Sequence, residues 1–245
     1  MPSFFKSKKD FKNHYDDEAE RYDAARIDTP DGAWVTDREV NFVRENLQLK
    51  PGSKILEAGC GTGRILIPLA ETGLQCFGID PAQNMLSILL TKSSAEELRN
   101  HVCTGDIENI PFCNDTFDGV YTINVLQWLP ESYGKSFTEM YRVAKKGARI
   151  IMDFPNRYSF WKCLKMPLML IMRSARVSNK TFTLGELRKS FDHLCNGHYV
   201  IKSQFSYPKK FYKYFFISNI ITLFEKLLPL PFHFRGKFYV IVTKK

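Results

Sequence analysis

A turn with glycine at every second position constrains the fold of this chain more than any other feature. The turn covers residues 59–63 (GCGTG), and it follows residues 54–58 (KILEA), which have the composition of a short buried strand. A helical pattern follows at once, over residues 64–71. Glycine allows positive φ and close approach of a ligand to the backbone, and a helix N-terminus offers unpaired N–H groups. This strand, turn and helix therefore predict a ligand site at the carboxyl end of a parallel strand.

The spacing of the glycines and two acids downstream favour a nucleoside as the ligand. The turn is G-x-G-x-G, whereas dinucleotide-binding folds carry G-x-G-x-x-G and P-loops carry G-x-x-x-x-G-K. Asp80 ends the next predicted strand, where a carboxylate can accept hydrogen bonds from both ribose hydroxyls. Asp106 and Ile107 end the third strand, where they can meet an adenine amino group and the adenine ring. A dinucleotide or a triphosphate is less favoured.

Strands and helices alternate along the chain. Predicted strands cover residues 54–58, 75–79, 102–103, 117–124, 148–153, 199–207 and 237–243. Predicted helices cover residues 64–71, 82–90, 133–143 and 183–194, and helical patches also occur within residues 1–50. Alternation at this spacing indicates parallel βαβ units with helices on both faces of the sheet, which is a doubly wound α/β fold.

Five features in this order resemble class I methyltransferases, in particular the small-molecule members grouped as methyltransferase type 11. They are E-x-G-x-G-x-G at residues 57–63, the acid after the second strand, G-D-I-x-x-x-P-F at 105–112, Phe117-Asp118, and A-K-K-G-A at 144–148. The resemblance covers residues 51–153 and, in outline, the whole chain. It implies a Rossmann-like, seven-stranded, mostly parallel sheet with an N-terminal helical lid and a helical insert before the last strand. It also implies S-adenosylmethionine as the cofactor and S-adenosylhomocysteine as its product.

The same resemblance assigns residues to the cofactor. The glycine turn would lie beside the methionine part, Met85 would pack on adenine, and Asn124 would line the sulfonium end. Residues 16–23 resemble the A-x-x-Y-D helix of small-molecule members, so that Tyr22, together with Tyr15 and Arg26, would cover the cofactor as a lid. The full assignment is Tyr22, Arg26, Glu57, Gly59, Cys60, Gly61, Gly63, Asp80, Met85, Asp106, Ile107 and Asn124. Helix capping by Asp80 and plain helix packing by Tyr22 remain open alternatives.

A catalytic base is the least certain part of the predicted chemistry. Methyl transfer from a sulfonium depends mainly on positioning and desolvation, and a base is needed only if the acceptor arrives protonated. Trp128 stands where relatives often carry His, and the Gln127-Trp128 pair is similar to that of methyltransferases that act on carboxylates; packing alone is the other interpretation. If a base is used, the candidates are Asp153, which ends a parallel strand, and His193 or His198. No residue pattern predicts a metal site.

Charge and aromatic residues concentrate in the second part of the chain. The net charge is +9, with −5 over residues 1–154 and +14 over residues 155–245, which also hold 18 of the 34 aromatic residues. The segment 208–236 mixes Lys and Arg with apolar side chains, as helices at a membrane interface do. We therefore expect it to meet an anionic membrane surface, to cover the substrate, or to contact another subunit. Nucleic acid is a less favoured partner, and the oligomeric state stays open.

Six scattered cysteines without a CxxC pair or a Cys/His cluster predict neither disulfides nor zinc, and they favour a reducing compartment. The first residues lack a signal-peptide pattern, and no apolar run is long enough to span a bilayer. We therefore expect a cytoplasmic protein, either free or peripheral at the membrane. The predicted parts are an N-terminal helical lid (1–50), a cofactor-binding core (51–153) and a substrate-side region (154–245).

The predicted function is methyl transfer from S-adenosylmethionine to a small molecule. The acceptor would be a hydroxyl, carboxylate or amine of a lipid-linked, sugar or carboxylate metabolite, and the sequence does not say whether the methyl goes to O, N, C or S. An RNA or DNA methyltransferase is one alternative. A non-catalytic, membrane-associated protein that binds the cofactor is the other.

Overall fold

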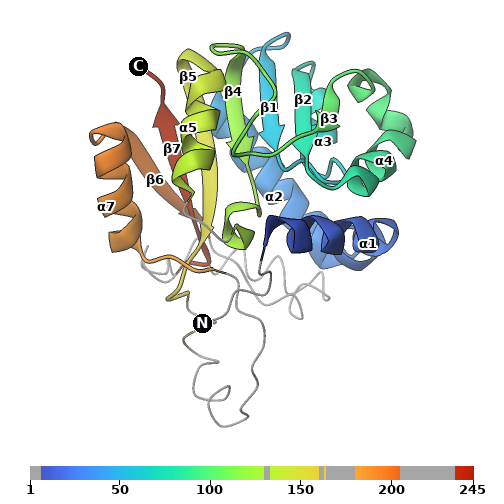
Figure 1. Ribbon diagram of the computed structural model, residues 1–245, viewed down its shortest axis with the longest axis horizontal. Helices are drawn as coiled ribbons and strands as arrows, with labels where there is room; N and C mark the ends of the chain where they lie inside the picture. The colour runs from blue at the N-terminus through green and yellow to red at the C-terminus, as the bar shows by residue number, and fades with distance from the viewer. Residues whose placement is uncertain (1–6, 130–132, 160–162, 164–179, 205–234) are drawn as a thin grey trace.

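A seven-stranded sheet with helices on both faces forms the centre of the protein (Figure 1). The computed structural model describes residues 7–129, 133–159, 163, 180–204 and 235–245. The strand order is β3-β2-β1-β4-β5-β7-β6. β7 runs antiparallel to β5 and β6, and the other paired strands are parallel. The expected doubly wound, mostly parallel α/β sheet is confirmed.

The described elements follow the predicted alternation. The strands are β1 (Lys54–Ala58), β2 (Gln75–Asp80), β3 (Val102–Thr104), β4 (Phe117–Thr122), β5 (Ala144–Pro155), β6 (Tyr199–Gln204) and β7 (Lys237–Thr243). The α-helices are α1 (Lys8–Arg26), α2 (Pro30–Leu47), α3 (Leu66–Ala70), α4 (Gln83–Thr91), α5 (Gly134–Val143) and α7 (Leu184–Cys195). Short 3₁₀ helices are η1 (Ser93–Leu98) and η2 (Leu126–Trp128). The helical insert expected at 208–236 lies almost wholly outside the described residues.

Among the element ends that the structure describes, the largest differences from the predicted bounds are in α3, β4 and β5. α3 begins two residues late, because the glycine turn extends into Arg64 and Ile65. β4 ends before Asn124, whose φ of 64° leaves the extended conformation. β5 is longer than residues 148–153, since its first residues pair with the start of β4 across an irregularity in the register.

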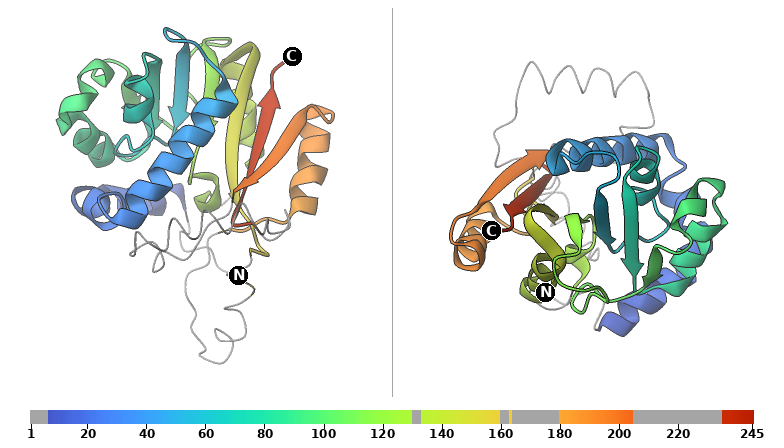
Figure 2. Two further views of the ribbon diagram at one scale, coloured as in Figure 1. Left: turned by 180° about the vertical axis from the view of Figure 1, so that it is seen from behind. Right: turned by 90° about the horizontal axis from the view of Figure 1, so that it is seen from above.

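The strands alternate their side chains between two hydrophobic cores. On one face, α5 and α7 cover Ile150, Met152 and the even-numbered residues of β7. On the other face, α2, α3 and α4 cover Ile151, Tyr239 and Ile241. Seen from behind, α2 crosses this second face diagonally (Figure 2). Both faces are therefore closed by helices, and the carboxyl edge of the parallel strands stays accessible to a ligand.

The helix α1 lies across the carboxyl ends of β1 and β2 (Figure 1). Asp16 accepts a hydrogen bond from the backbone N–H of Asn84 in α4 (2.9 Å). Asp23 accepts one from the Thr62 hydroxyl in the glycine turn (2.6 Å) and pairs with Lys92 (2.6 Å). These contacts fasten the N-terminal helix over the edge at which the sequence predicts a ligand.

The structure tests some of the predictions about cysteines, membrane spans, metal sites and the division of the chain. The six cysteines are free thiols. Among the described residues, no helix is long and apolar enough to cross a membrane. No group of three or more His, Cys, Asp or Glu side chains in that part of the chain is arranged to hold a metal ion. The division of the chain at residues 50 and 153 remains a prediction.

An aromatic cluster closes the face under α5 and α7. The Phe191 ring is fully buried, and its centroid lies 5.7 Å from those of Tyr133 and Phe137 and 5.9 Å from that of Phe154. Rings at these separations gain contact energy beyond the area that they bury.

We expect Phe191→Ala to lower the free energy of unfolding by about 3–5 kcal/mol, because it removes a buried ring and leaves a cavity. Leu194→Ala on the same helix is the matched control, since Leu194 is 37% exposed and should cost less than about 1 kcal/mol. Urea denaturation followed by circular dichroism measures both. Equal losses for the two variants would contradict the assigned core.

Candidate functional site

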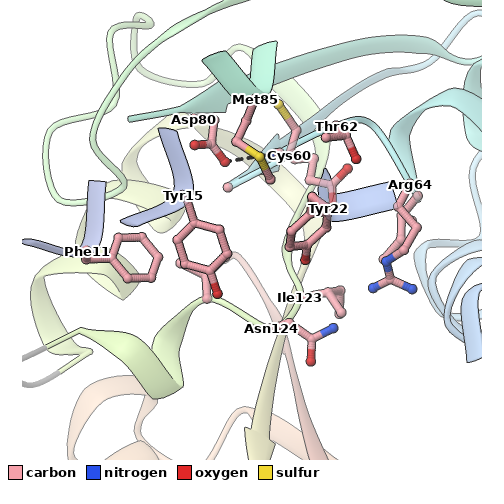
Figure 3. Close-up of a pocket in the computed structure, with 15 residues that line it drawn as sticks. Phe11, Tyr15, Tyr22, Cys60, Thr62, Arg64, Asp80, Met85, Ile123 and Asn124 are labelled. Carbon is pink, nitrogen blue, oxygen red and sulfur yellow. Dashed lines mark hydrogen bonds between the residues drawn. The ribbon is translucent and has the colours of Figure 1, made fainter. Parts of the chain in front are cut away.

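A pocket opens at the carboxyl ends of β1, β2 and β4, next to the point at which the strand order reverses. Open α/β sheets bind ligands in this position. The pocket measures about 570 Å³ when the space open to solvent is included, and it is here called the glycine-turn pocket (Figure 3). It is lined by Phe11, Tyr15, Tyr22, Glu57, Gly59, Cys60, Gly61, Thr62, Arg64, Ile65, Asp80, Met85, Ile123, Asn124 and Val125.

The glycine turn takes a backbone path that other residues would resist. Gly59 and Gly61 have φ of 88° and 51°, and a Cβ on Gly59 would collide with the Val125 side chain. The N–H groups of Gly59 and Cys60 donate to the Ile79 carbonyl (2.7 and 3.0 Å), which ties the turn to β2. The turn is therefore rigid and presents bare backbone to the pocket.

Asp80 is held at the end of β2 by two backbone hydrogen bonds. Its Oδ2 accepts from Gly61 N (2.8 Å) and its Oδ1 from Ala82 N (2.9 Å). Burial raises the pKa of Asp80 to about 6, and the two N–H groups only partly offset that effect. The carboxylate thus both caps the turn and lines the pocket, so that helix capping and ligand binding are compatible roles.

Glu57 is a buried carboxyl at the floor of the pocket. The Tyr121 hydroxyl donates to its Oε2 (3.0 Å). Burial raises the pKa of Glu57 to about 8, despite that hydrogen bond. At neutral pH the group is therefore mainly protonated in the ligand-free protein.

Aromatic side chains of α1 cover the open side of the pocket. Phe11, Tyr15 and Tyr22 project from this helix, facing Met85 of α4 (Figure 3). The Arg26 guanidinium lies over the Tyr22 ring (4.8 Å to its centroid) and farther from Tyr15 (5.9 Å). A flat, apolar ring system would fit between this aromatic cover and Met85.

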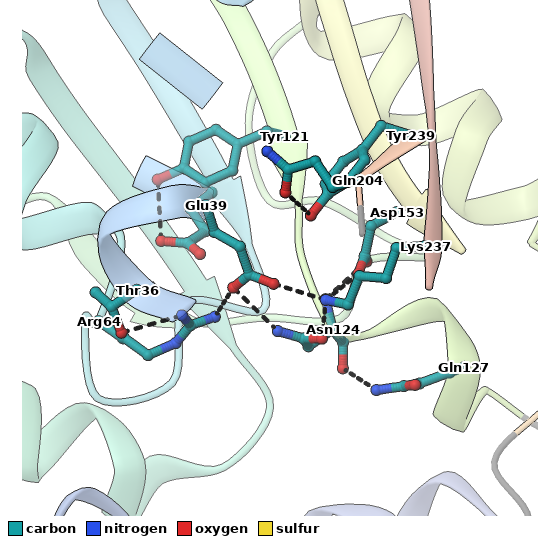
Figure 4. Close-up of polar contacts among 11 residues, drawn as sticks. Thr36, Glu39, Arg64, Tyr121, Asn124, Gln127, Asp153, Gln204, Lys237 and Tyr239 are labelled. Carbon is teal, nitrogen blue, oxygen red and sulfur yellow. Dashed lines mark hydrogen bonds and ion pairs between the residues drawn. The ribbon is translucent and has the colours of Figure 1, made fainter. Parts of the chain in front are cut away.

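A network of buried charges lies behind the pocket (Figure 4). Lys237 Nζ donates to Glu39 Oε1 (2.6 Å), Asn124 Oδ1 (2.6 Å) and Asp153 Oδ2 (2.9 Å). Arg64 Nη2 pairs with Glu39 Oε2 (2.5 Å). Two cations therefore balance two carboxylates, and together they join α2, the glycine turn, β4, β5 and β7. We call these five residues the Lys237 network.

The pKa shifts in the Lys237 network follow from its charges. Burial alone would raise the pKa of Glu39, but Lys237 and Arg64 outweigh burial and lower it to about 2. Burial alone would lower the pKa of Lys237, yet Asp153 and Glu39 raise it. Glu39, Arg64 and Lys237 thus keep their charges at neutral pH.

Asn124 is held at every polar atom. Its backbone N–H donates to Asp153 Oδ1 (2.7 Å) and its carbonyl accepts from Gln127 Nε2 (3.3 Å). Its side chain accepts from Lys237 and donates to Glu39 (3.4 Å). A non-glycine residue at positive φ persists only when its surroundings hold it in place, and such positions cluster at functional sites.

A second pocket of about 770 Å³ adjoins the first and is here called the Lys237 pocket. It shares Tyr15, Tyr22, Arg64 and Asn124 with the glycine-turn pocket. The rest of its lining is Arg26, Ile27, Gly32, Val35, Glu39, Gln127, Trp128 and Lys237. The shared residues stand where a group could pass from one pocket to the other.

The structure brings most of the predicted cofactor residues together. Around the glycine-turn pocket lie Tyr22, Glu57, Gly59, Cys60, Gly61, Asp80, Met85 and Asn124. Gly63 packs instead against Leu89 and Ile67, and Arg26 lines only the Lys237 pocket. Their roles toward a cofactor stay predictions.

The predicted adenine residues lie slightly apart from this group. Asp106 pairs with Lys8 at the start of α1 (2.8 Å), and Lys8 also pairs with Glu108 (2.6 Å). Ile107 is buried in the hydrophobic core. Neither Asp106 nor Ile107 is among the lining residues of the glycine-turn pocket.

The candidate bases occupy very different positions. Asp153 is buried at the end of β5, and both its oxygens are engaged, by Asn124 N and Lys237 Nζ. His198 precedes β6 at the opposite edge of the sheet, where it contacts Lys245. His193 is exposed on α7. Asp153 is therefore placed to orient Asn124, and general-base catalysis by any of the three residues remains untested.

Three site residues escaped the sequence analysis. Arg64 follows the glycine turn directly, so its position was a usable signal. Glu39 lies four residues before the buried Val43, and an acid on the buried face of a helix also points to a partner. Lys237 opens the last strand without any local sign of its role, because its partners lie 198, 113 and 84 residues away.

Comparison with known proteins agrees with the geometry. Residues 56–152 match the family model described as "Methyltransferase domain". This part of the chain is a class I, S-adenosylmethionine-dependent type of methyltransferase domain, as the motifs predict. The match spans the glycine turn, Asp80 and Asn124 and ends just before Asp153.

Individual relatives share this domain. Demethylmenaquinone methyltransferase of Geobacillus sp. (strain WCH70) is 33% identical over 144 residues, which cover 54% of this chain and 60% of that protein. Malonyl-[acyl-carrier protein] O-methyltransferase of Serratia marcescens is 32% identical over 103 residues, covering 42% of this chain and 38% of that protein. The chain thus spans about half the length of these relatives. A crystal structure of a SAM-dependent methyltransferase from Thermotoga maritima has the same fold, with a TM-score of 0.59, 18% identity, and coverage of 96% of this chain and 99% of that one.

The raised pKa of Glu57 predicts a pH-dependent stability. The unfolded chain releases this proton near the ordinary glutamate pKa of 4.5, whereas the folded protein keeps it up to about pH 8. Between these values the folded state binds more protons, so its stability falls as pH rises, by at most about 1.4 kcal/mol per pH unit. Glu57→Gln removes this contribution. We expect the stability of the wild type, relative to that of the variant, to decline from pH 5 to pH 8 in urea melts, and parallel curves would contradict the assignment.

Proposed function

We propose that this chain transfers the methyl group of S-adenosylmethionine to a small-molecule acceptor. The observation that carries the proposal is the glycine-turn pocket, in which a bare backbone turn and the Asp80 carboxylate lie at the carboxyl edge of a parallel sheet. Asp80 supports ribose binding, and the aromatic cover of α1 with Met85 supports adenine binding. The names of two relatives, a demethylmenaquinone methyltransferase and a malonyl-[acyl-carrier protein] O-methyltransferase, support a small or carrier-bound acceptor.

The two adjoining pockets suggest how the chain would organise the reaction. The cofactor, when bound, supplies an electrophilic methyl group on a positively charged sulfur. The protein would then need to hold the acceptor in line and exclude water. Asn124 stands between the pockets with its position set by the Lys237 network, and Tyr15 and Tyr22 cover both pockets from α1. We propose that the Lys237 pocket receives the acceptor.

We expect Asp80→Ala to weaken binding of S-adenosylhomocysteine about 100-fold, because two charge-assisted hydrogen bonds to the ribose would be lost. Isothermal titration calorimetry measures the change without any acceptor. Asp37→Ala, an exposed acid on α2, is the control and should bind as the wild type does. No binding by the wild type, or equal binding by Asp80→Ala, would refute the proposed function.

The charge of the second part of the chain supports peripheral membrane attachment, in the cytoplasm, as an additional proposal. Residues 155–245 carry a net charge of +14, and the segment 208–236 contains Lys209, Lys210, Lys213, Lys226 and Arg235 among apolar residues. Each cation near an anionic surface contributes about 1 kcal/mol. In liposome flotation we expect more protein to float with phosphatidylserine vesicles than with neutral vesicles. Equal recovery would argue against attachment.

A further inference from the structure

We propose that the Lys237 pocket binds its ligand through a carboxylate, so that the acceptor of the proposed methyl transfer is a small carboxylic acid in its ionised form. This inference rests on the proposed function only in treating the ligand as the methyl acceptor. Its evidence is the charge and the shape of the Lys237 pocket. Arg26, Arg64 and Lys237 line that pocket, against a single acid, Glu39.

The two cations of the Lys237 network are more exposed than the two carboxylates that pair with them. The side chains of Arg64 and Lys237 are 17% and 18% exposed, whereas Glu39 is 3% exposed and Asp153 is 2% exposed. Glu39 contacts both cations, and Asp153, which does not line the pocket, contacts Lys237. A ligand that enters the pocket therefore meets positive charge first, in positions that the buried carboxylates hold.

Two arginines have the donors that a carboxylate needs. A guanidinium carries five N–H donors in a planar fork that matches the two oxygens of a carboxylate. The described hydrogen bonds of Arg64 employ two of its N–H groups, toward Thr36 (3.2 Å) and Glu39 (2.5 Å). Arg26 donates to Glu18 (2.6 Å) and also interacts with the Tyr15 hydroxyl, which leaves part of its fork unused. Lys237 directs its three donors to Glu39, Asn124 and Asp153, so it would contribute charge and would not bind the ligand directly.

The charge balance favours a monoanion over a dianion. The three cations are matched by three carboxylates, those of Glu18, Glu39 and Asp153. A charge-balanced cluster in which Arg64, Lys237, Glu39 and Asp153 are mostly buried accommodates one added negative charge more readily than two, because every uncompensated charge costs desolvation energy. This favours a carboxylate over a phosphate group.

The rest of the lining indicates the body of the acid. Tyr15, Tyr22 and Trp128 supply aromatic surface, and Ile27 and Val35 supply aliphatic surface. An apolar or aromatic body with one carboxylate combines the two kinds of lining. The sequence analysis placed Arg26 at the cofactor, whereas its position in the Lys237 pocket favours a role at the acceptor.

The test is a calorimetric titration of the full chain saturated with S-adenosylhomocysteine, at pH 7, using benzoate and butyrate as probes and their amides as neutral matches. We expect each carboxylate to bind at least tenfold more tightly than its amide, and more tightly than phenyl phosphate. Arg26→Gln should weaken benzoate binding at least tenfold and change the affinity for S-adenosylhomocysteine less than twofold. Arg44→Gln, an exposed arginine on α2, is the matched control and should change neither.

Three outcomes would overturn the inference. Amides that bind as well as the carboxylates would exclude recognition of the charge. Tighter binding of phenyl phosphate would mean that the pocket recognises a phosphate and not a carboxylate. Carboxylate binding that occurs only without S-adenosylhomocysteine, and is lost when it is added, would assign the cations to the cofactor. Failure of the proposed function is visible separately, because S-adenosylhomocysteine would then not bind in the first titration. If Arg26→Gln does not fold, the comparison of acids with amides in the wild type decides alone.

Discussion

The ion pairs around Lys237 connect the helix α2 and the end of the glycine turn to the strands of the sheet. Lys237 bonds to Glu39 on α2, Asn124 after β4 and Asp153 on β5, and Arg64 after the glycine turn bonds to the same Glu39. Removing one member would leave a buried charge without its partner, which costs far more than the intact pair contributes. The network therefore fixes the relative positions of these segments more than it stabilises the fold. It sets the position of Asn124, which lines both pockets and has a left-handed backbone.

Local sequence was sufficient to place the glycine turn and Asp80 together at one pocket. The glycine turn requires residues that accept positive φ, and Asp80 must follow the next strand. Both requirements concern short segments, and the spacing of these segments is visible in the sequence. The capping box at the start of α7 is of the same kind, since Thr183 and Glu186 bond to each other's backbone across three residues. Where the chemistry depends on neighbours along the chain, the interpretation of the residues and the structure agree.

The acceptor side depends on contacts between distant segments, and the sequence could not supply these. Asp153 was a candidate base because the predicted fifth strand ends there. In the structure Lys237, which opens β7 without any local sign of its role, donates to one of its oxygens. Asp106 was expected to be open toward adenine, and Lys8 from the start of α1 reaches it across 98 residues. In both cases the strand end was located correctly, and the partner that determines the carboxylate's role came from an element whose approach only the fold reveals.

The pairing of β6 with β7 has a consequence for how such a chain can change. Gln204 and Lys237 are register partners at the end of these two strands, so the sheet holds both ends of the intervening stretch side by side. A segment of any length or composition can link them without altering the strand register or the cofactor edge. Lys237 is also the first residue after that link to enter the charge network. The segment between β6 and β7 can thus change while the cofactor site stays the same. New acceptor preferences could arise in this segment, and the residues that bind the methyl donor would be inherited unchanged.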